Sequence, residues 1–89
     1  MIGSGIKKVR QVRGLKQSEL ARFCGVGSHQ ISRVESGRLN PSIRLLDRAA
    51  RSLGVPVWVL WFVADAGETV HESMVNGIIQ QIYLKNAKK

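Results

Sequence analysis

The chain contains few of the residues on which disulfide-stabilised, metal-binding and catalytic proteins depend. Its one cysteine, Cys24, cannot form a disulfide within the chain, and its place among apolar residues predicts a small buried side chain. The two histidines, His29 and His71, are far apart in the sequence. Neither a zinc-ligand set, a carboxylate pair nor a glycine-rich phosphate loop is present. We therefore expect no metal, no cofactor and no enzymatic activity.

Long hydrophobic runs are also missing. The apolar segment at residues 55–64 carries no charge, but it has half of the roughly 20 residues that a membrane-spanning helix needs. Residues 1–5 lead directly into a basic segment, without the apolar stretch of a secretory leader. Internal repeats and low-complexity segments are absent, and 89 residues suffice for one small domain. We expect a cytoplasmic protein that does not enter a membrane.

The positive charge is concentrated in the first part of the chain. Of the fourteen Lys and Arg residues, eleven lie within residues 1–53, where only three acidic residues oppose them. Residues 54–89 are electrically balanced, so this first part carries the whole net charge of +8. Such an asymmetry favours a polyanionic partner such as nucleic acid. A basic surface that only keeps the protein in solution is the alternative.

Residues 17–36 have the pattern of two short helices that cross at a steep angle. Apolar or small residues recur at helical spacing on the inner side of both segments, namely Leu20, Ala21, Cys24, Ile31 and Val34. Gly25 can adopt positive φ and end the first of the two helices. The outward side of the second helix, residues 28–36, is a polar row made of Ser28, His29, Gln30, Ser32 and Arg33. Hydrogen-bonding side chains on one helix face can contact base edges in the DNA major groove.

Two further helices flank this pair. The first runs from Gly3 or Ser4 to Arg13, with Ile2, Ile6 and Val9 on its apolar side. The other covers residues 43–53, begins after the favourable N-cap Ser42, and has a predicted inner stripe of Ile43, Leu46, Ala49, Ala50 and Leu53. Lys16 and Gly27 hold the N-cap positions of the helices at 17–24 and 28–36. Neither has a hydroxyl, so these two helices depend on packing more than on capping.

Residues 55–64 are rich in β-branched and aromatic side chains, which would suit a strand. Pro56 nevertheless fits the first turn of a helix, and we favour a fifth helix here. A helix that is apolar on all sides needs a second partner, because monomers rarely expose large apolar patches. We expect one face to pack on the core and the other on a second subunit. A wholly internal helix is the alternative.

The end of the chain predicts an accessory helix. Residues 65–68 form a break, Thr69 and Glu72 match a capping box, and an amphipathic helix starts at Val70. Its predicted stripe is Val70, Met74, Ile78 and Ile82, flanked by Val75 and Ile79. The helix either clamps a dimer partner or packs back on its own chain. We therefore divide the chain into residues 1–64 and 65–89, and the expected dimer contacts are Trp58, Trp61, Phe62, Met74 and Ile78.

Over residues 2–60 the sequence resembles the phage repressor and Cro group of helix-turn-helix proteins, often called Xre-type. The matching features are Arg10, the run Gln-Ser-Glu-Leu-Ala at 17–21, Gly25-Val26 at the turn, Ile-Ser-Arg-Val-Glu-Ser-Gly at 31–37, and Asn-Pro-Ser at 40–42. The length and the last helix are similar to restriction–modification controller proteins and some antitoxins. Lys16 and Gly27 depart from the hydroxyl caps that are usual in this group.

The resemblance implies an all-α fold in which a five-helix repressor-like domain carries one additional C-terminal helix. It also implies a transcription regulator, most simply a repressor, that binds a roughly palindromic operator as a homodimer with residues 28–36 in each major groove. Ser28, His29 and Arg33 would reach base edges, with Gln30 and Ser32 nearer the backbone or groove wall. Contacts to DNA phosphates are expected from Lys16, Gln17, Ser18, Arg38, Asn40 and Arg44.

Two further expectations follow from the resemblance. Arg10 and Glu35 would form a partly buried ion pair; the alternative is two exposed charges of little energetic weight. The competing function is that of an antitoxin-type interaction protein, which binds a partner protein through its apolar C-terminal region and autoregulates its own operon. A bound partner protein, or a toxin gene next to this one, would favour that alternative.

Overall fold

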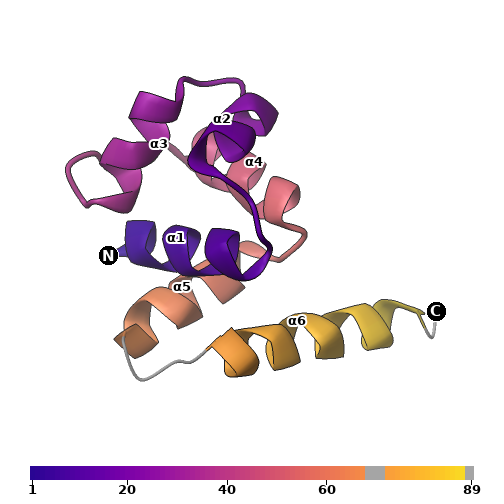
Figure 1. Ribbon diagram of the computed structural model, residues 1–89. Helices are drawn as coiled ribbons and strands as arrows, with labels where there is room; N and C mark the ends of the chain where they lie inside the picture. The colour runs from indigo at the N-terminus through magenta and orange to yellow at the C-terminus, as the bar shows by residue number, and fades with distance from the viewer. Residues whose placement is uncertain (68–71, 88–89) are drawn as a thin grey trace.

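The computed structural model describes residues 1–67 and 72–87, and all regular structure within them is α-helical (Figure 1). The helices are α1 (Ile2–Val12), α2 (Gln17–Cys24), α3 (Ser28–Glu35), α4 (Ile43–Leu53), α5 (Val57–Ala66) and α6 (Glu72–Ala87). The bounds of α2 and α4 match the predicted residues, and the expectation of an all-α fold is confirmed.

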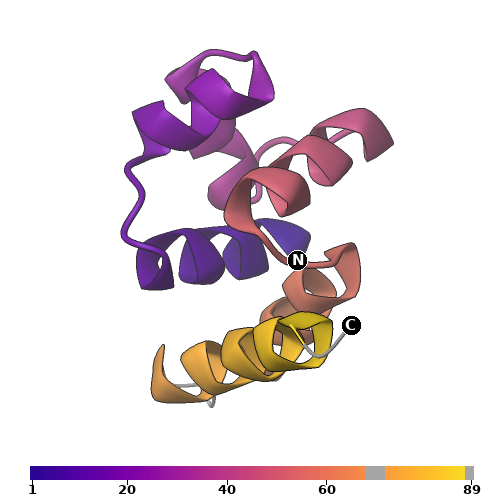
Figure 2. The ribbon, with the colours of Figure 1, turned by 90° about the vertical axis from the view of Figure 1, so that its right-hand side faces the viewer.

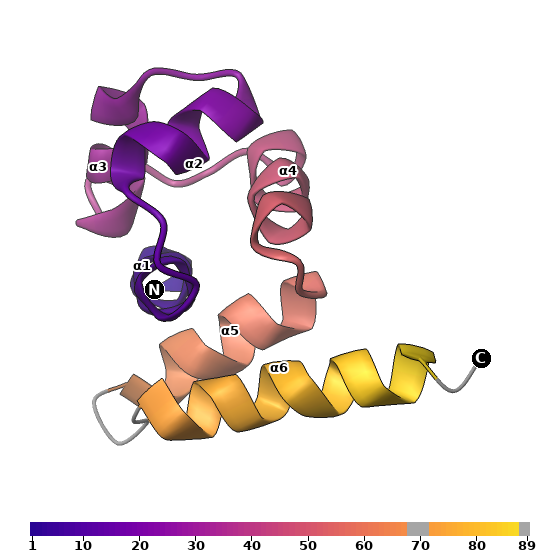
Figure 3. The same ribbon diagram turned by 45° about the vertical axis from the view of Figure 1, so that its right-hand side comes forward.

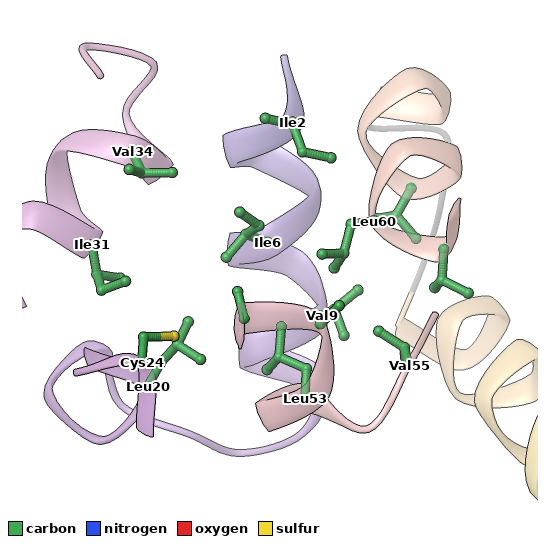
Figure 4. Packing of buried hydrophobic residues seen from close by; sticks show 14 of the residues in the cluster. Ile2, Ile6, Val9, Leu20, Cys24, Ile31, Val34, Leu53, Val55 and Leu60 are labelled. Atoms are coloured by element: carbon green, nitrogen blue, oxygen red, sulfur yellow. The ribbon is translucent and has the colours of Figure 1, made fainter. Parts of the chain in front are cut away.

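Helix α1 lies in the middle of the molecule, with α2 and α3 on one side and α5 on the other (Figure 3). Its apolar side chains Ile6 and Val9 are fully buried and meet buried residues from all the surrounding helices (Figure 4). Among these are Leu20 of α2, Ile31 of α3, Leu53 of α4 and Leu60 of α5. Full burial of such a side chain stabilises the fold by about 1.5–3 kcal/mol, so this cluster holds the helices around α1.

Glycine ends two of the helices as the sequence predicts. Gly25 and Gly54 follow α2 and α4 with φ of 73° and 72°, a left-handed conformation that glycine adopts without a Cβ clash. At the other end of α4, Ser42 Oγ accepts a hydrogen bond of 3.0 Å from the Leu45 amide, which confirms the predicted N-cap. Lys16 and Gly27 are the N-caps of α2 and α3, and neither makes a side-chain cap hydrogen bond.

Several predicted boundaries were wrong by one or two residues. Helix α1 starts at Ile2 and ends at Val12, and α3 ends at Glu35 rather than at residue 36. Helix α5 continues to Ala66, through two residues that the sequence suggested were a break. Gly67 then ends it with φ 62°, a backbone conformation that glycine adopts without a Cβ clash.

The predicted inner stripe of α4 was wrong at its first turn. Ile43 is 89% exposed, whereas Leu45 is buried. The buried side of α4 consists of Leu45, Ala49, Ala50 and Leu53, with Leu46 packed at its edge. Ile43 is the first residue after the N-cap, so it lies at the end of the helix where no neighbouring element covers it. Helical periodicity alone does not show whether a neighbouring element covers the first apolar residue of a stripe.

Helix α6 runs along the side of the bundle that faces away from α2 and α3 (Figure 2). Among the α6 side chains that the structure describes, residues 72–82, Val75 and Ile79 are buried, although the sequence predicted that they only flank the apolar stripe. Helix α6 packs on α1 of its own chain. Met74, predicted as part of the stripe, is half exposed, and Ile78 and Ile82 are partly buried. Thr69 and Val70, on which the predicted capping box and helix start depend, lie outside the described residues, as does His71.

The described helices are too short or too polar, taken singly, to cross a membrane. Within residues 1–67 and 72–87, only α4 and α5 taken together, with a bend of 92° between them, have the required length and apolar character. The same residues contain no group of three or more His, Cys, Asp or Glu side chains that could hold a metal ion.

Candidate nucleic-acid interface

Helices α2 and α3 pack against each other and are joined by a short turn at residues 25–27. Ile31 and Val34 point into the core, and both are almost completely buried. The opposite side of α3 lies at the surface, and each residue of the predicted polar row is exposed there: Ser28, His29, Gln30, Ser32 and Arg33. The structure thus brings all five candidate base-contacting side chains onto one accessible helix face.

A buried ion pair anchors the end of α3 to α1. Arg10 Nε donates to Glu35 Oε2 at 2.7 Å, and Arg10 Nη2 donates to Glu35 Oε1 at 3.0 Å. The two side chains are 10% and 2% exposed, and Arg10 Nη1 also donates to the Leu15 carbonyl oxygen at 2.8 Å. A bidentate geometry away from water is the strongest form of this interaction. Of the two alternatives left open by the sequence, the structure has the buried pair.

Gln17 extends this network to α2. Its Nε2 donates to Glu35 Oε1 at 2.9 Å, so one carboxylate receives hydrogen bonds from two helices other than its own. A glutamine amide carries two N–H groups, and this bond occupies one of them. The side chain that the sequence suggested for a DNA phosphate therefore already has an internal role.

The other phosphate candidates lie at the start of α2, in the α3–α4 loop and at the start of α4. Lys16 and Ser18 are exposed at the start of α2, and Arg38 and Asn40 are exposed in the loop between α3 and α4. Arg44 is exposed in the first turn of α4. These positions come from three separate segments, and each lies near a helix start or in the loop that follows α3. Helix starts favour anions because their free amides and the helix dipole point toward the ligand.

Helix α4 holds the turn that precedes α3. Arg48 Nη1 donates to the Cys24 carbonyl oxygen at 3.1 Å, at the C-terminal end of α2. Burial raises the pKa of the Cys24 thiol, while a hydrogen bond with Ser52 and the charge of Arg48 act in the opposite direction. The thiol therefore stays protonated and apolar at neutral pH, as expected for a small core residue.

Sequence reasoning missed several residues that position this surface. Arg13 Nε donates to the Leu53 carbonyl oxygen at 2.9 Å and covers the end of α4, as Arg48 covers the end of α2. Gly3 and Gly5 are buried within α1, against the backbones of α3 and α5. The sequence did contain a signal for this close packing, namely Gly3 and Gly5, two residues apart at the start of a predicted helix. Glycine weakens a helix, so its presence there needs a packing reason.

The outer side of α5 is an aromatic surface. Trp58, Trp61 and Phe62 are 56%, 46% and 48% exposed, while Val59, Leu60 and Val63 of the same helix are buried. Trp58 and Phe62 contact each other edge to face, with ring centroids 6.5 Å apart. Met74 of α6 is also half exposed, and Ile78 is partly buried. The five residues predicted for a dimer interface are thus at least partly accessible.

Comparison with known proteins gives a consistent result. A family model described as helix-turn-helix matches residues 6–57, more than half of the chain. Over 78 residues the chain is 31% identical to the cryptic phage CTXphi transcriptional repressor RstR of Vibrio cholerae. That match covers 88% of this chain and 68% of the repressor.

Two solved structures are similar over nearly the whole chain. The clp gene regulator ClgR from Corynebacterium glutamicum is 25% identical with a TM-score of 0.71, and the match covers 94% of this chain and 83% of that one. A structure of the SinR protein in complex with the SinI protein is 29% identical with a TM-score of 0.63. That match covers 97% of this chain and 99% of the matched chain.

Proposed function

The chain belongs to the helix-turn-helix family of DNA-binding transcriptional regulators, and we propose that it acts as a homodimer on a roughly palindromic operator. Helix α3 of each protomer lies in a major groove, and the proposed site of action is the cytoplasm. The observation that carries this proposal is the exposed polar row on α3, fixed from behind by the buried Arg10–Glu35–Gln17 network.

Within this proposal the residues of α3 have different roles. Ser28, His29 and Arg33 contact base edges, whereas Gln30 and Ser32 lie nearer the backbone or the groove wall. Arg33 is the strongest candidate for sequence readout, because a guanidinium group can donate to O6 and N7 of one guanine together. Its exposure on the side of α3 opposite Ile31 and Val34 supports this role.

The phosphate contacts come from the segments beside α3. Lys16, Gln17 and Ser18 at the start of α2 grip the DNA backbone on one side, and Arg38, Asn40 and Arg44 do so on the other. Such contacts fix the register of a protein on the duplex without reading its sequence. The excess charge of +8 in residues 1–53 supports a share of affinity that depends strongly on salt.

Selection of bound fragments from a random DNA pool tests this function. The purified chain is expected to enrich one sequence with two-fold symmetry, whose half-sites lie one helical turn apart, ~34 Å. Recovery of fragments without a common sequence, at a salt concentration where binding still occurs, would contradict operator recognition.

Two arginine variants separate readout from positioning. Arg33→Ala is expected to weaken binding to the selected operator by about 1–3 kcal/mol and to relax the preference at one base pair of each half-site. Arg38→Ala should weaken binding to operator and to random DNA alike, with a shallower dependence of affinity on salt. Titrations of both variants on both DNAs measure this. Equal losses for Arg33→Ala on the two DNAs would assign Arg33 to a phosphate.

The dimer in this proposal forms through the aromatic side of α5, with α6 at its edge. Three aromatic side chains that are each about half exposed leave about 300 Å² of apolar surface in water, from the roughly 150–250 Å² that each ring buries when covered. Patches of that size on a monomer are often functional. A two-fold symmetric dimer covers the patch and matches the symmetry of a palindromic operator.

A second candidate function is the binding of a different protein at this surface, as in the antitoxin-type alternative. The observation that favours it is the similarity to SinR in its complex with SinI, a match that includes nearly the whole of this chain. The half-exposed Met74 and the aromatic side of α5 would then contact the partner. A chain that stays monomeric at micromolar concentration, yet binds a protein encoded beside its gene, would favour this function over the homodimer.

A further inference from the structure

Two glycines bring α1 into backbone contact with helices on its opposite sides. A Cβ atom added at Gly3 would lie 1.9 Å from the Val34 carbonyl oxygen, near the end of α3. A Cβ added at Gly5 would lie 2.0 Å from the Leu60 carbonyl oxygen and 3.1 Å from Ala64 Cβ, both in α5. At these two positions any side chain would collide with backbone atoms, which cannot rotate away.

Helix α1 is therefore the spacer between α3 and α5. Figure 4 shows α1 between Val34 of α3 on one side and Leu60 of α5 on the other. Toward α3, the Gly3 contact with Val34 and the Arg10–Glu35 ion pair both hold the C-terminal end of α3 against α1. Helix α1 packs most extensively on α5. At Gly5 the backbones of these two helices touch, so they cannot come closer together. The distance from α3 to the outer side of α5 thus depends on the missing side chain at position 5.

We propose that Gly5 is a specificity-determining residue, which sets the spacing of operator half-sites that the dimer accepts. This inference rests on the proposed function, since it requires that α3 contacts DNA and that α5 forms the dimer interface. Gly5 itself touches neither DNA nor the partner subunit. It fixes how far each reading helix lies from the two-fold axis, and a dimer recognises paired half-sites only at the matching separation.

The size of the effect follows from the contact distances. Ordinary contact with a Cβ begins at 3.4 Å, so a methyl group at position 5 has to move α5 away from α1 by more than an ångström. Both protomers carry the change, so the separation of the two α3 helices shifts by up to roughly 3 Å, close to the ~3.4 Å rise of one base pair. One base pair also rotates a half-site by about 35° around the duplex, so this displacement mismatches the original spacer without fitting the next one, and the preference for the original spacer falls.

The experiment uses duplexes that carry the two selected half-sites with spacers varied one base pair at a time. Wild type, Gly5→Ala and Ala64→Met compete for this set, and circular dichroism and light scattering check that each protein is folded and dimeric. Ala64→Met introduces a flexible wedge at the same contact from the α5 side, so it decides the question if Gly5→Ala does not fold. The matched control is Gly77→Ala in α6, where an added Cβ meets nothing within 4 Å.

Wild type and Gly77→Ala are expected to share one preferred spacer. Gly5→Ala and Ala64→Met should lose about tenfold or more of the preference for that spacer, while their affinity for a single half-site changes less than about twofold. The inference would be overturned if Gly5→Ala or Ala64→Met is folded and dimeric but keeps the wild-type spacer preference. It would also be overturned if these variants are folded but no longer form the dimer. If wild type itself selects no paired half-sites, the proposed function fails instead.

Discussion

Replacement of Glu35 by alanine is expected to lower the free energy of unfolding by about 3–5 kcal/mol, because it leaves Arg10 charged and buried without its partner. The carboxylate accepts two hydrogen bonds from Arg10 and one from Gln17, so its loss disconnects α3 from both α1 and α2. A typical domain is stable by only about 5–15 kcal/mol, so this loss is a large share of the total. Thermal unfolding should show a fall in melting temperature of at least ~12 °C for a domain of this size.

The exposed ion pair of the same chain is the control for Glu35→Ala. Arg51 Nε lies 3.1 Å from Asp47 Oδ2 on the outer side of α4, with side chains 81% and 52% exposed. Asp47→Ala should cost less than about 1 kcal/mol, because water screens the pair. The double variant Arg10→Met/Glu35→Leu should recover part of the stability that Glu35→Ala loses, since no buried charge is left. If Glu35→Ala and Asp47→Ala have equal small effects, the buried pair does not stabilise the fold as described.

Replacement of both Trp58 and Trp61 by serine is expected to weaken the dimer by at least about 2 kcal/mol, a rise of about 30-fold or more in its dissociation constant. Aromatic residues at the centre of an interface contribute most of its binding energy, and these two lie three residues apart on the outer side of α5. Sedimentation equilibrium measures the dissociation constant. Affinity for a paired operator should fall with the dimer, while affinity for a single half-site should be almost unchanged.

Phe23 supplies the matched control for the tryptophan variant. It is an exposed aromatic residue, 63% accessible, but it lies on α2 rather than on α5 or α6. Phe23→Ser should leave the dissociation constant of the dimer unchanged. An equal rise for Phe23→Ser would indicate a general effect of removing exposed aromatic side chains, and an unchanged dimer in the Trp58→Ser/Trp61→Ser variant would exclude the α5 surface as the interface.

The sequence predicted most of the local structure because local structure depends on neighbouring residues. The bounds of α2 and α4, the glycine ends of both helices and the Ser42 cap follow from helical periodicity and from the conformations that glycine and serine favour. The errors at Ile43 and on α6 have a common cause. Each depends on which neighbouring element covers a helix face, and a periodic pattern does not contain that information.

In the candidate site, too, the direction of side chains on one helix could be predicted from the sequence, and contacts between helices could not. The polar row on α3 could be listed from the sequence, because burial of Ile31 and Val34 determines which side of a helix faces outward. The engagement of Gln17 with Glu35, eighteen residues away, could not, since it depends on how α2 and α3 cross. The contact of Arg48 with the end of α2 likewise joins residues 24 apart in the sequence.

The amino-acid sequence by itself determined that this protein is all-helical, where its helix-turn-helix lies and which side chains of residues 28–36 face outward, because these properties arise from spacing along a helix. Only the tertiary structure decided that α1 lies between α3 and α5 in direct backbone contact with both. Gly3 permits the contact with α3, and Gly5 permits the contact with α5. A glycine in a sequence indicates freedom of the backbone. Which neighbour occupies the space left by its missing side chain depends on the packing of residues thirty and more than fifty positions further along the chain.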